Sequence, residues 1–328
     1  MLKSAIMTNN MLKTLAENPT DAIFGLQPDG EIFKMPISTT PHMIIAGQTG
    51  SGKSVYVNAL LISMISHATP EELQIFWIDP KKVEATAYIQ LPYCPTDPII
   101  NMADAYGLIY YLIGLMEERY EILSETKTKN LEEYNKWYEK NLESVSNKWG
   151  KMPYIICVID EFADLIEQFP EIEKGIQRLC QKARAAGIHL IICTQRPSVN
   201  VITGNIKANI PTRICLKVAD GINSHIILDD IGGEKLRGNG DSLIKSERND
   251  SFMRVQGLYI SNEEIETIFK SLREKYGKPK FIDYKQKCVD WGYVEWENEY
   301  AENIPWDKKH VVPVGNKKTM TARQLFGL

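Results

Sequence analysis

A glycine-rich stretch with one lysine is the part of this sequence best suited to chemistry. Residues 47–54 read Gly-Gln-Thr-Gly-Ser-Gly-Lys-Ser and fit the spacing G-x-x-x-x-G-K-[ST]. The apolar run His42-Met43-Ile44-Ile45-Ala46 precedes this loop with the length of a buried strand, and residues 55–62 follow it as an apolar helix. A glycine-rich loop between a strand and a helix can turn its backbone N–H groups toward phosphate oxygens. This context favours a phosphate site over a glycine-rich turn that matches by chance.

The residue types of the loop predict separate roles around ATP and Mg²⁺. Lys53 is expected to reach the β- and γ-phosphates, and the Ser54 hydroxyl is expected to bind Mg²⁺. The partial positive charge at the helix N-terminus adds to the attraction for phosphate. The predicted nucleotide-binding residues are Gly47, Gln48, Thr49, Gly50, Ser51, Gly52, Lys53, Ser54 and Val55.

Two adjacent acids at the end of another buried strand provide the next reactive groups. The apolar run Tyr154–Ile159 leads directly into Asp160 and Glu161. Asp160 is expected to hold Mg²⁺ through water, and Glu161 to polarise the attacking water. The competing interpretation is that both acids cap the following helix, since acids suit a helix N-terminus. With the phosphate loop present, the pair favours hydrolysis over binding alone. Gln195, which follows a further apolar run, is a weaker candidate to sense the γ-phosphate and position water.

The elements that must position these groups alternate along the chain. Strand-length apolar runs also lie at residues 75–78, 189–193 and 214–218. Apolar residues recur at helical spacing over 102–125, and residues 171–186 are typical of a helix that stops at Gly187. Residues 126–150 are polar and helix-prone, which predicts an exposed helix. The alternation predicts an α/β fold with a mostly parallel sheet flanked by helices.

Composition and charge limit the possible partners and compartment. The chain has 328 residues and a formal net charge of −4, so any DNA binding must come from a local basic surface. No apolar run approaches the roughly 18–20 residues needed to span a bilayer, and the N-terminus lacks a signal-peptide pattern. We therefore expect no membrane segment, although a partner can recruit the chain to a membrane. Cys157, Cys193 and Cys215 lie in strand-like runs, which predicts buried, reduced thiols and a cytoplasmic location.

Long segments of the chain resemble the FtsK/SpoIIIE family of DNA-translocating motors. The resemblance covers about residues 25 to 270, and its central third is specific to this family among P-loop ATPases. Its matching segments include Ile78-Asp79-Pro80-Lys81-Lys82-Val83-Glu84, Asp160-Glu161-Phe162-Ala163-Asp164-Leu165, and residues 181–189 and 194–199. Further matches in the same order are residues 41–42, 68–72, 116–120, 201–204, 206–213, 232–236 and 240–241.

The resemblance implies a RecA-like motor domain that assembles as a ring, usually a hexamer, around double-stranded DNA. ATP then lies between neighbouring subunits, and Arg184 matches the position that reaches the next subunit's site as an arginine finger. Arg196, Ser198 and Lys207 match positions near the central channel, where contacts with phosphate are independent of base sequence; Thr194 is a further candidate. Without the family, Arg184 would be interpreted as a surface helix arginine and Lys207 as a solvated loop lysine.

The sequence also departs from the family pattern. Relatives carry basic residues where this chain has Gly221 and His225, so the second DNA-facing loop is less cationic. The family's N-terminal membrane helices and long linker are not expected here, nor is a winged-helix domain after residue 280. Residues 281–305 hold six acids against two lysines, with Trp291, Trp296 and Trp306 in or beside them. This acidic segment is expected to lie across a protein surface, either its own or that of a protein partner.

Three regions and three functional classes follow from these patterns. We expect a β-like lead-in at residues 1–40, an ATPase motor domain at 41–275, and an acidic, Trp-rich and irregular C-terminal extension at 276–328. The leading function is ATP-driven translocation of double-stranded DNA. The alternative is a coupling ATPase that feeds a DNA–protein or protein substrate into a conjugation or secretion machine. A third class, a non-catalytic scaffold ring, is disfavoured by the complete set of Lys53, Asp160, Glu161 and Arg184.

Overall fold

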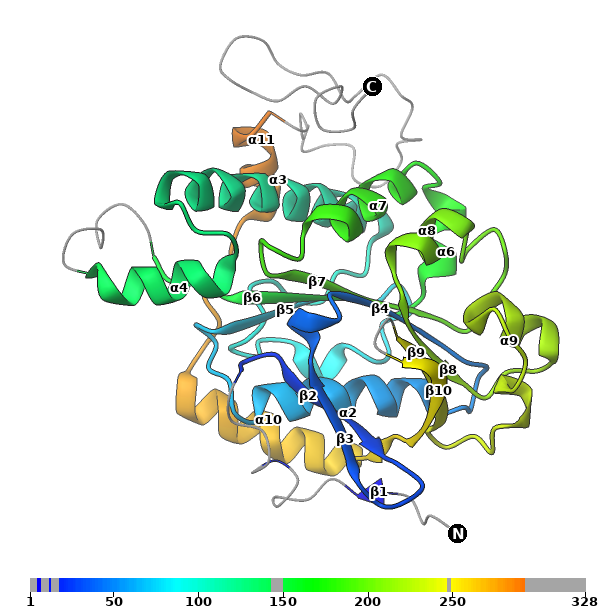
Figure 1. Cartoon of the computed structure of the whole chain (residues 1–328). Helices are drawn as coiled ribbons and strands as arrows, with labels where there is room; N and C mark the ends of the chain where they lie inside the picture. Colours follow the sequence, from blue (N-terminus) through cyan, green and yellow to red (C-terminus); the bar gives the residue numbers. More distant parts are fainter. Residues whose placement is uncertain (1–4, 7–11, 13–17, 143–149, 247–248, 293–328) are drawn as a thin grey trace.

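One nine-stranded sheet organises most of the chain. A computed structural model describes residues 5–6, 12, 18–142, 150–246 and 249–292. The strand order in the sheet is β3-β2-β10-β9-β8-β4-β7-β6-β5. Helices α2 and α10 cover one face, and α3, α6, α7 and α11 cover the other (Figure 1).

The parallel half of the sheet carries the candidate site. Its strands in spatial order are β8 (Thr212–Leu216), β4 (His42–Ala46), β7 (Ile188–Thr194), β6 (Tyr154–Ile159) and β5 (Leu73–Ile78). Every residue of β4, β6, β7 and β8 is buried, because helices cover both faces. The carboxyl ends of parallel strands meet at one edge of a sheet. The segments after β4, β5, β6 and β7 therefore meet at one edge.

The antiparallel half extends the same sheet. Strand β9 (Asp241–Ser246) pairs antiparallel with β8, and β10 (Asn249–Gln256), β2 (Asp21–Leu26) and β3 (Ile32–Pro36) follow in turn. Residues 21–36, which the sequence analysis assigned to a lead-in, are thus part of the main sheet. A small parallel pair joins β1 (Ala5–Ile6) to β11 (Leu258–Tyr259).

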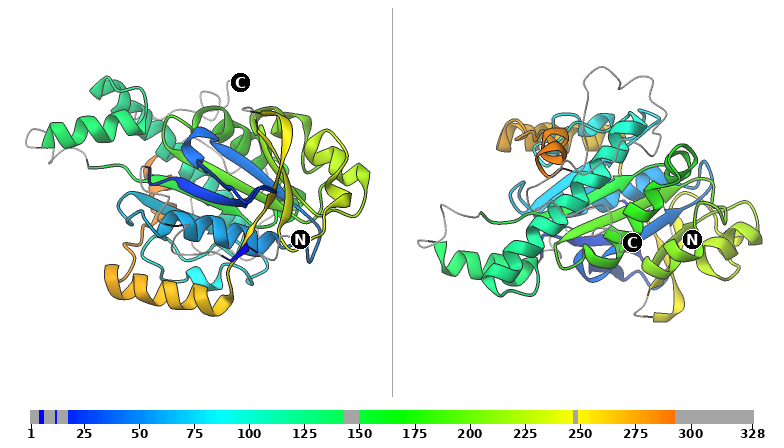
Figure 2. Two further views of the ribbon diagram at one scale, coloured as in Figure 1. Left: turned by 60° about the horizontal axis from the view of Figure 1, so that its bottom comes forward. Right: turned by 90° about the horizontal axis from the view of Figure 1, so that it is seen from above.

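The helices agree with the predicted pattern in position and differ at some boundaries. Helix α2 (Lys53–Ile65) follows the glycine-rich loop, and α3 (Met102–Thr126) matches the predicted helix. Helix α4 (Leu131–Lys140) is shorter than the range proposed for it and projects from one side (Figures 1 and 2). The remaining helices are α6 (Phe162–Gln168), α7 (Ile172–Lys182), α8 (Gly204–Asn209), α9 (Gly221–Leu228), α10 (Asn262–Tyr276) and α11 (Tyr284–Asp290).

Helix α7 ends four residues before the predicted boundary. The sequence predicted a helix to residue 186 with Gly187 as its stop, but residues 183–187 form a turn. The Gly187 N–H donates to the Arg184 carbonyl oxygen at 3.0 Å, and Gly187 has φ 68°, which favours glycine. The glycine therefore closes a separate turn after the helix and leads directly into β7.

The described start of the C-terminal extension packs on the chain's own surface. Tyr284 and Cys288 of α11 are buried against α3, and the rings of Tyr111 and Trp291 stack with centroids 5.6 Å apart. Lys285 and Asp104 form an ion pair. Residues 281–292 thus cover helix α3, whereas Trp296, Trp306 and the rest of the predicted extension lie outside the described residues.

Candidate nucleotide site

The glycine-rich loop between β4 and α2 has a conformation that its sequence requires. Gly50 and Gly52 have φ values of 78° and 95°, a region that side chains with a Cβ rarely occupy. A Cβ on Gly52 would lie 2.6 Å from the Gly240 nitrogen, and a Cβ on Gly47 would lie 2.6 Å from Ser51 Oγ. The Gly240 N–H also donates to the Ser51 carbonyl oxygen at 2.9 Å. Residues 239–240 therefore support the loop at Gly52, and neither Gly47 nor Gly52 has room for a larger side chain.

The donors at this loop suit a bound phosphate chain. Tyr56 N–H donates to the Gly52 carbonyl oxygen and closes the first turn of α2. The N–H groups ahead of it have no partner within the helix, and the helix dipole adds positive charge there. Together with the Lys53 ammonium, they form a donor set that matches phosphate oxygens.

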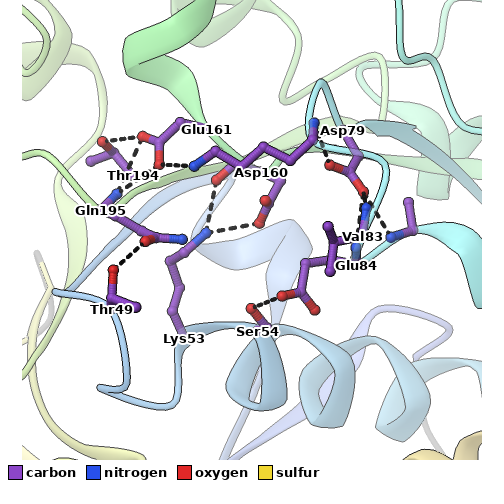
Figure 3. Close-up of polar contacts among 12 residues, drawn as sticks. Thr49, Lys53, Ser54, Asp79, Val83, Glu84, Asp160, Glu161, Thr194 and Gln195 are labelled. Carbon is purple, nitrogen blue, oxygen red and sulfur yellow. Dashed lines mark hydrogen bonds and ion pairs between the residues drawn. The ribbon is translucent and has the colours of Figure 1, made fainter.

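Lys53 is buried against the acid at the end of β6. Its Nζ lies 2.8 Å from Asp160 Oδ1 and 2.8 Å from the Asp160 carbonyl oxygen (Figure 3). Burial opposes the charged ammonium, but the surrounding charge and the hydrogen bond to Asp160 leave the pKa of Lys53 above its ordinary value. Lys53 and Asp160 thus form an ion pair. A bound phosphate would compete for Lys53, and a metal ion would compete for Asp160.

Glu161 is fully buried and occupied by three donors. Its Oε1 accepts the Thr194 hydroxyl at 2.7 Å, its Oε2 lies 3.1 Å from Lys81 Nζ, and the Gln195 N–H approaches both oxygens at 3.2 Å. Glu161 stands at the N-cap position of α6, yet its side chain makes no capping hydrogen bond. The helix-capping interpretation therefore does not account for this carboxylate, which faces the ends of β5 and β7 (Figure 3).

Gln195 connects the end of β7 to the phosphate loop. Its Oε1 accepts the Thr49 hydroxyl at 2.8 Å. The structure thus brings Thr49, Lys53, Glu161 and Gln195, all four of which the sequence assigned to the nucleotide site, to one sheet edge. Thr194 belongs with this group, because its side chain is fully buried and does not face the surface.

Three residues after β5 complete the site and had been assigned no role from the sequence. Glu84 Oε1 accepts the Ser54 hydroxyl at 2.6 Å, and Lys81 reaches Glu161. Asp79 is fully buried, and its carboxylate fixes the following loop by accepting hydrogen bonds from the backbone N–H groups of that loop. The available signal was positional: an acid directly after a buried strand that ends at the same edge as β6.

Arg184 lies far from these groups. It is exposed in the turn before β7, at the amino end of that strand. The phosphate loop and Gln195 lie at the carboxyl end. The six steps between the seven residues of β7, at about 3.3 Å each, separate the two edges by about 20 Å. The structure therefore does not place Arg184 with the site of its own chain.

The basic residues proposed to contact DNA are paired with acids. Arg196 forms ion pairs with Asp164, by a very short contact, and with Glu167 at 3.8 Å. Lys207 of α8 lies 2.7 Å from Asp229 Oδ1.

Asp229 also pairs with two further cations. Ser198, another residue proposed to contact DNA, is partly buried. Arg213 and Lys245 approach Asp229 Oδ2 at 2.6 and 3.0 Å. Burial alone would raise the pKa of Asp229, but hydrogen bonds from the three cations hold it well below its ordinary range. One carboxylate thus sits among three cations, and the cluster keeps a net positive charge.

The described residues contain no group of three or more His, Cys, Asp or Glu side chains arranged to hold a metal ion. A phosphate-bound Mg²⁺ needs only one or two protein ligands, because phosphate oxygens and water complete its shell. Ser54 and Asp160 fit that requirement.

No helix within the described part of the chain is long and apolar enough to cross a bilayer. All six cysteines are buried and unpaired, as predicted for three of them.

The fold and the site together define a P-loop ATPase architecture. The phosphate loop follows β4, the acid pair follows β6, and β7 lies between these two strands in the sheet. The sequence profile of the FtsK/SpoIIIE family matches residues 9–199. The chain belongs to the FtsK/SpoIIIE family.

Curated relatives show how the chain corresponds to longer proteins. DNA translocase FtsK from Chlamydia muridarum is 43% identical over 270 residues, covering 80% of this chain and 34% of the relative. The corresponding protein from Oceanobacillus iheyensis is 42% identical over 298 residues, covering 90% and 37%. This chain therefore spans about a third of the length of the curated relatives it matches.

Solved structures with the same fold include ATPases of two transfer systems. The pCW3 conjugation coupling protein TcpA, solved as a monomer with ATPγS, superposes with a TM-score of 0.71 at 28% identity. The match covers 84% of this chain and 75% of TcpA. The cytoplasmic domain of the type VII secretion ATPase EccC from Thermomonospora curvata has a TM-score of 0.69 at 21% identity, covering 82% and 34%. The second likeness concerns the fold alone.

Proposed function

We propose that this chain is an ATP-hydrolysing motor that translocates double-stranded DNA. The observation that carries the proposal is the convergence of Lys53, Asp160, Glu161 and Gln195 at one sheet edge. Family membership supports DNA as the substrate. The relatives are DNA translocases, and this chain corresponds to about a third of their length.

The proposed chemistry assigns each step to a residue. The loop N–H groups and Lys53 would hold the ATP phosphates, and Ser54 and Asp160 would hold Mg²⁺, Asp160 through water; when bound, the ion would offset charge on the phosphate oxygens. Glu161 accepts a proton from water as the water oxygen bonds to the γ-phosphorus. The bond from that phosphorus to the β–γ bridging oxygen breaks, and ADP leaves with the electron pair.

The proposed assembly is a ring, with six subunits as the expected number. Arg184 lies on the edge opposite its own phosphate loop, which supports action on a neighbouring subunit. Arg196, Ser198 and Lys207 are proposed to face DNA phosphate in the channel. We also propose that residues 41–275, with strands β2 and β3, act as the motor. We propose that residues 276–328 act as an extension that packs on helix α3 through residues 281–292 and offers its remainder to a protein partner, and the unpaired cysteines suit the cytoplasm.

The similarity to TcpA favours a second candidate, a coupling ATPase that feeds a DNA–protein or protein substrate into an export machine. The ATPase rate with and without linear duplex DNA separates the two. Stimulation by naked duplex supports translocation. A rate that ignores DNA but rises with a protein partner supports coupling.

Two substitutions test the assigned chemistry. Lys53→Ala should abolish nucleotide binding, because the ammonium contacts phosphate in the ground state. Glu161→Gln should retain binding and lose turnover, because the carboxylate acts on the attacking water. Fluorescent-nucleotide binding and phosphate release measure the two effects. Near-normal turnover by Glu161→Gln would remove this carboxylate from the mechanism.

A further inference from the structure

The loop after β5 contacts two residues of the proposed chemistry at once. We call residues 79–85 the Asp79 loop. The Asp79 carboxylate is fully buried and accepts backbone N–H groups from Lys81, Val83, Glu84 and Ala85 at 2.9–3.0 Å. Four hydrogen bonds to one buried carboxylate fix the path of the loop. Lys81 and Glu84 therefore leave a rigid backbone toward Glu161 and Ser54.

The contact with Lys81 occupies one carboxylate oxygen of Glu161, the proposed base. Glu161 has no exposed surface, and Thr194 and Gln195 already donate to its oxygens from the end of β7. Lys81 Nζ donates to Oε2 at 3.1 Å. To accept a proton from water, Glu161 must release one of these donors. Thr194 and the Gln195 N–H are held by the strand end, whereas the Lys81 side chain is 40% exposed and can turn away.

A cavity beside Lys81 contains two acids that could replace Glu161 as the partner of the Lys81 ammonium. Its volume is about 330 Å³, and Lys81, Asp164 and Glu167 line it with apolar neighbours. Both acids are paired with Arg196, the residue proposed to contact DNA. When Arg196 turns to a DNA phosphate, the two acids lose this cation, and Lys81 is the cation that lines the same cavity.

We propose that Lys81 is a positioning residue that restrains Glu161 until DNA draws Arg196 away from Asp164, after which Lys81 moves to the freed acids. The inference rests on the proposed function, since it presumes both ATP hydrolysis and binding of DNA. The proposed movement of Lys81 explains how DNA binding could stimulate ATP hydrolysis. A contact with phosphate at Arg196 changes the charge in the cavity, and that change frees one oxygen of the buried carboxylate.

The test compares Lys81→Met with two matched variants of the full chain. Lys81→Met keeps the length of the side chain and removes its charge. Its DNA-free ATPase rate should rise about 3- to 10-fold, as expected for loss of one partly exposed charge-assisted hydrogen bond, with KM for ATP unchanged. Lys82→Met removes an adjacent exposed charge and should match wild type. Lys81→Arg keeps the charge and should restore the low DNA-free rate.

The acids of the cavity should give the opposite result. Replacing Asp164 by Asn together with Glu167 by Gln removes the destination of Lys81. The DNA-stimulated rate of this double variant should fall, while Lys81→Met should lose stimulation because its DNA-free rate is already high. An unchanged or lower DNA-free rate in Lys81→Met overturns the proposal. Equal stimulation of the double variant and wild type overturns the proposed route from DNA.

A second readout does not depend on ATP turnover. Acylation of lysines, followed by mass spectrometry, compares Lys81 with Lys82 as an internal reference. Lys81 should be labelled several-fold faster in Glu161→Gln than in wild type, because the neutral amide cannot hold the ammonium. Equal labelling would show that the contact is absent and overturns the proposal even in an active enzyme. An inactive wild type with faster labelling in the variant would refute the proposed function and leave the restraint supported.

Discussion

The position of Arg184 leads to the sharpest prediction about assembly. This arginine is exposed in the turn before β7, about 20 Å along the strand from the sheet edge that carries the phosphate loop. No side chain spans that distance, so the guanidinium cannot contact ATP bound to its own chain. If Arg184 contributes to hydrolysis, it must do so from a neighbouring subunit.

Arg184→Ala should therefore lower turnover by about 100-fold or more without preventing ATP binding, given the contribution of arginines supplied in trans. Mixing this variant with Glu161→Gln should recover activity. One subunit then supplies the carboxylate and its neighbour the arginine. With equal, random mixing in a ring, about a quarter of the interfaces pair a good carboxylate with a good arginine, so about a quarter of wild-type turnover is expected.

The assay is phosphate release under conditions in which subunits exchange. Lys182→Ala, two residues away and also exposed, is the matched control and should behave as wild type. Native mass spectrometry should confirm that mixed rings form. Mixed rings that never exceed the sum of the two separate variants would refute the shared site. Loss of ATP binding in Arg184→Ala would show a structural role instead.

Two further predictions concern DNA and pH. Replacing Arg196 and Lys207 by Ala should flatten the log–log salt dependence of DNA binding by about 0.9 per lost phosphate contact, equally on unrelated duplexes; an unchanged slope would place DNA elsewhere. Burial lowers the pKa of His189 to about 4 and that of His42 well below its ordinary value. The unfolded chain then binds more protons below about pH 6.5, so stability should fall from that pH toward 4, by up to about 1.4 kcal/mol per pH unit for each histidine. Urea unfolding should show this slope, and a double Asn variant of the two histidines should flatten it.

Local sequence patterns were sufficient to predict the phosphate loop and the strands around it. Gly50 and Gly52 occupy backbone conformations that favour glycine, and the lysine that follows them is the first residue of helix α2. The run Tyr154–Ile159 likewise has the length and unbroken apolar composition of a buried strand. These features depend on residues close together in the chain, so their order in the sequence carries the information.

The extent of the sheet and the end of α7 were less accessible. Strand β2 pairs with β10 through Leu26 and Gln256, more than 200 positions apart, and no local pattern reports such a pairing. Helix α7 ends at Lys182 because a turn closed by Gly187 aligns the chain with β7. The sequence correctly indicated a chain turn at Gly187, but it predicted that the helix continues to residue 186, four residues beyond its observed end at Lys182.

By itself, the sequence determined which residues could bind phosphate, hold Mg²⁺ and activate water, because those capacities reside in residue type and local spacing. Only the tertiary structure decided which charges neutralise one another. Lys81 meets Glu161 because β5 lies beside β6, and Arg196 meets Asp164 because the ends of β6 and β7 share one edge. The order of strands in a sheet is set by packing across the whole domain. It is therefore the long-range arrangement, rather than any motif, that converts these separate residues into a connected site.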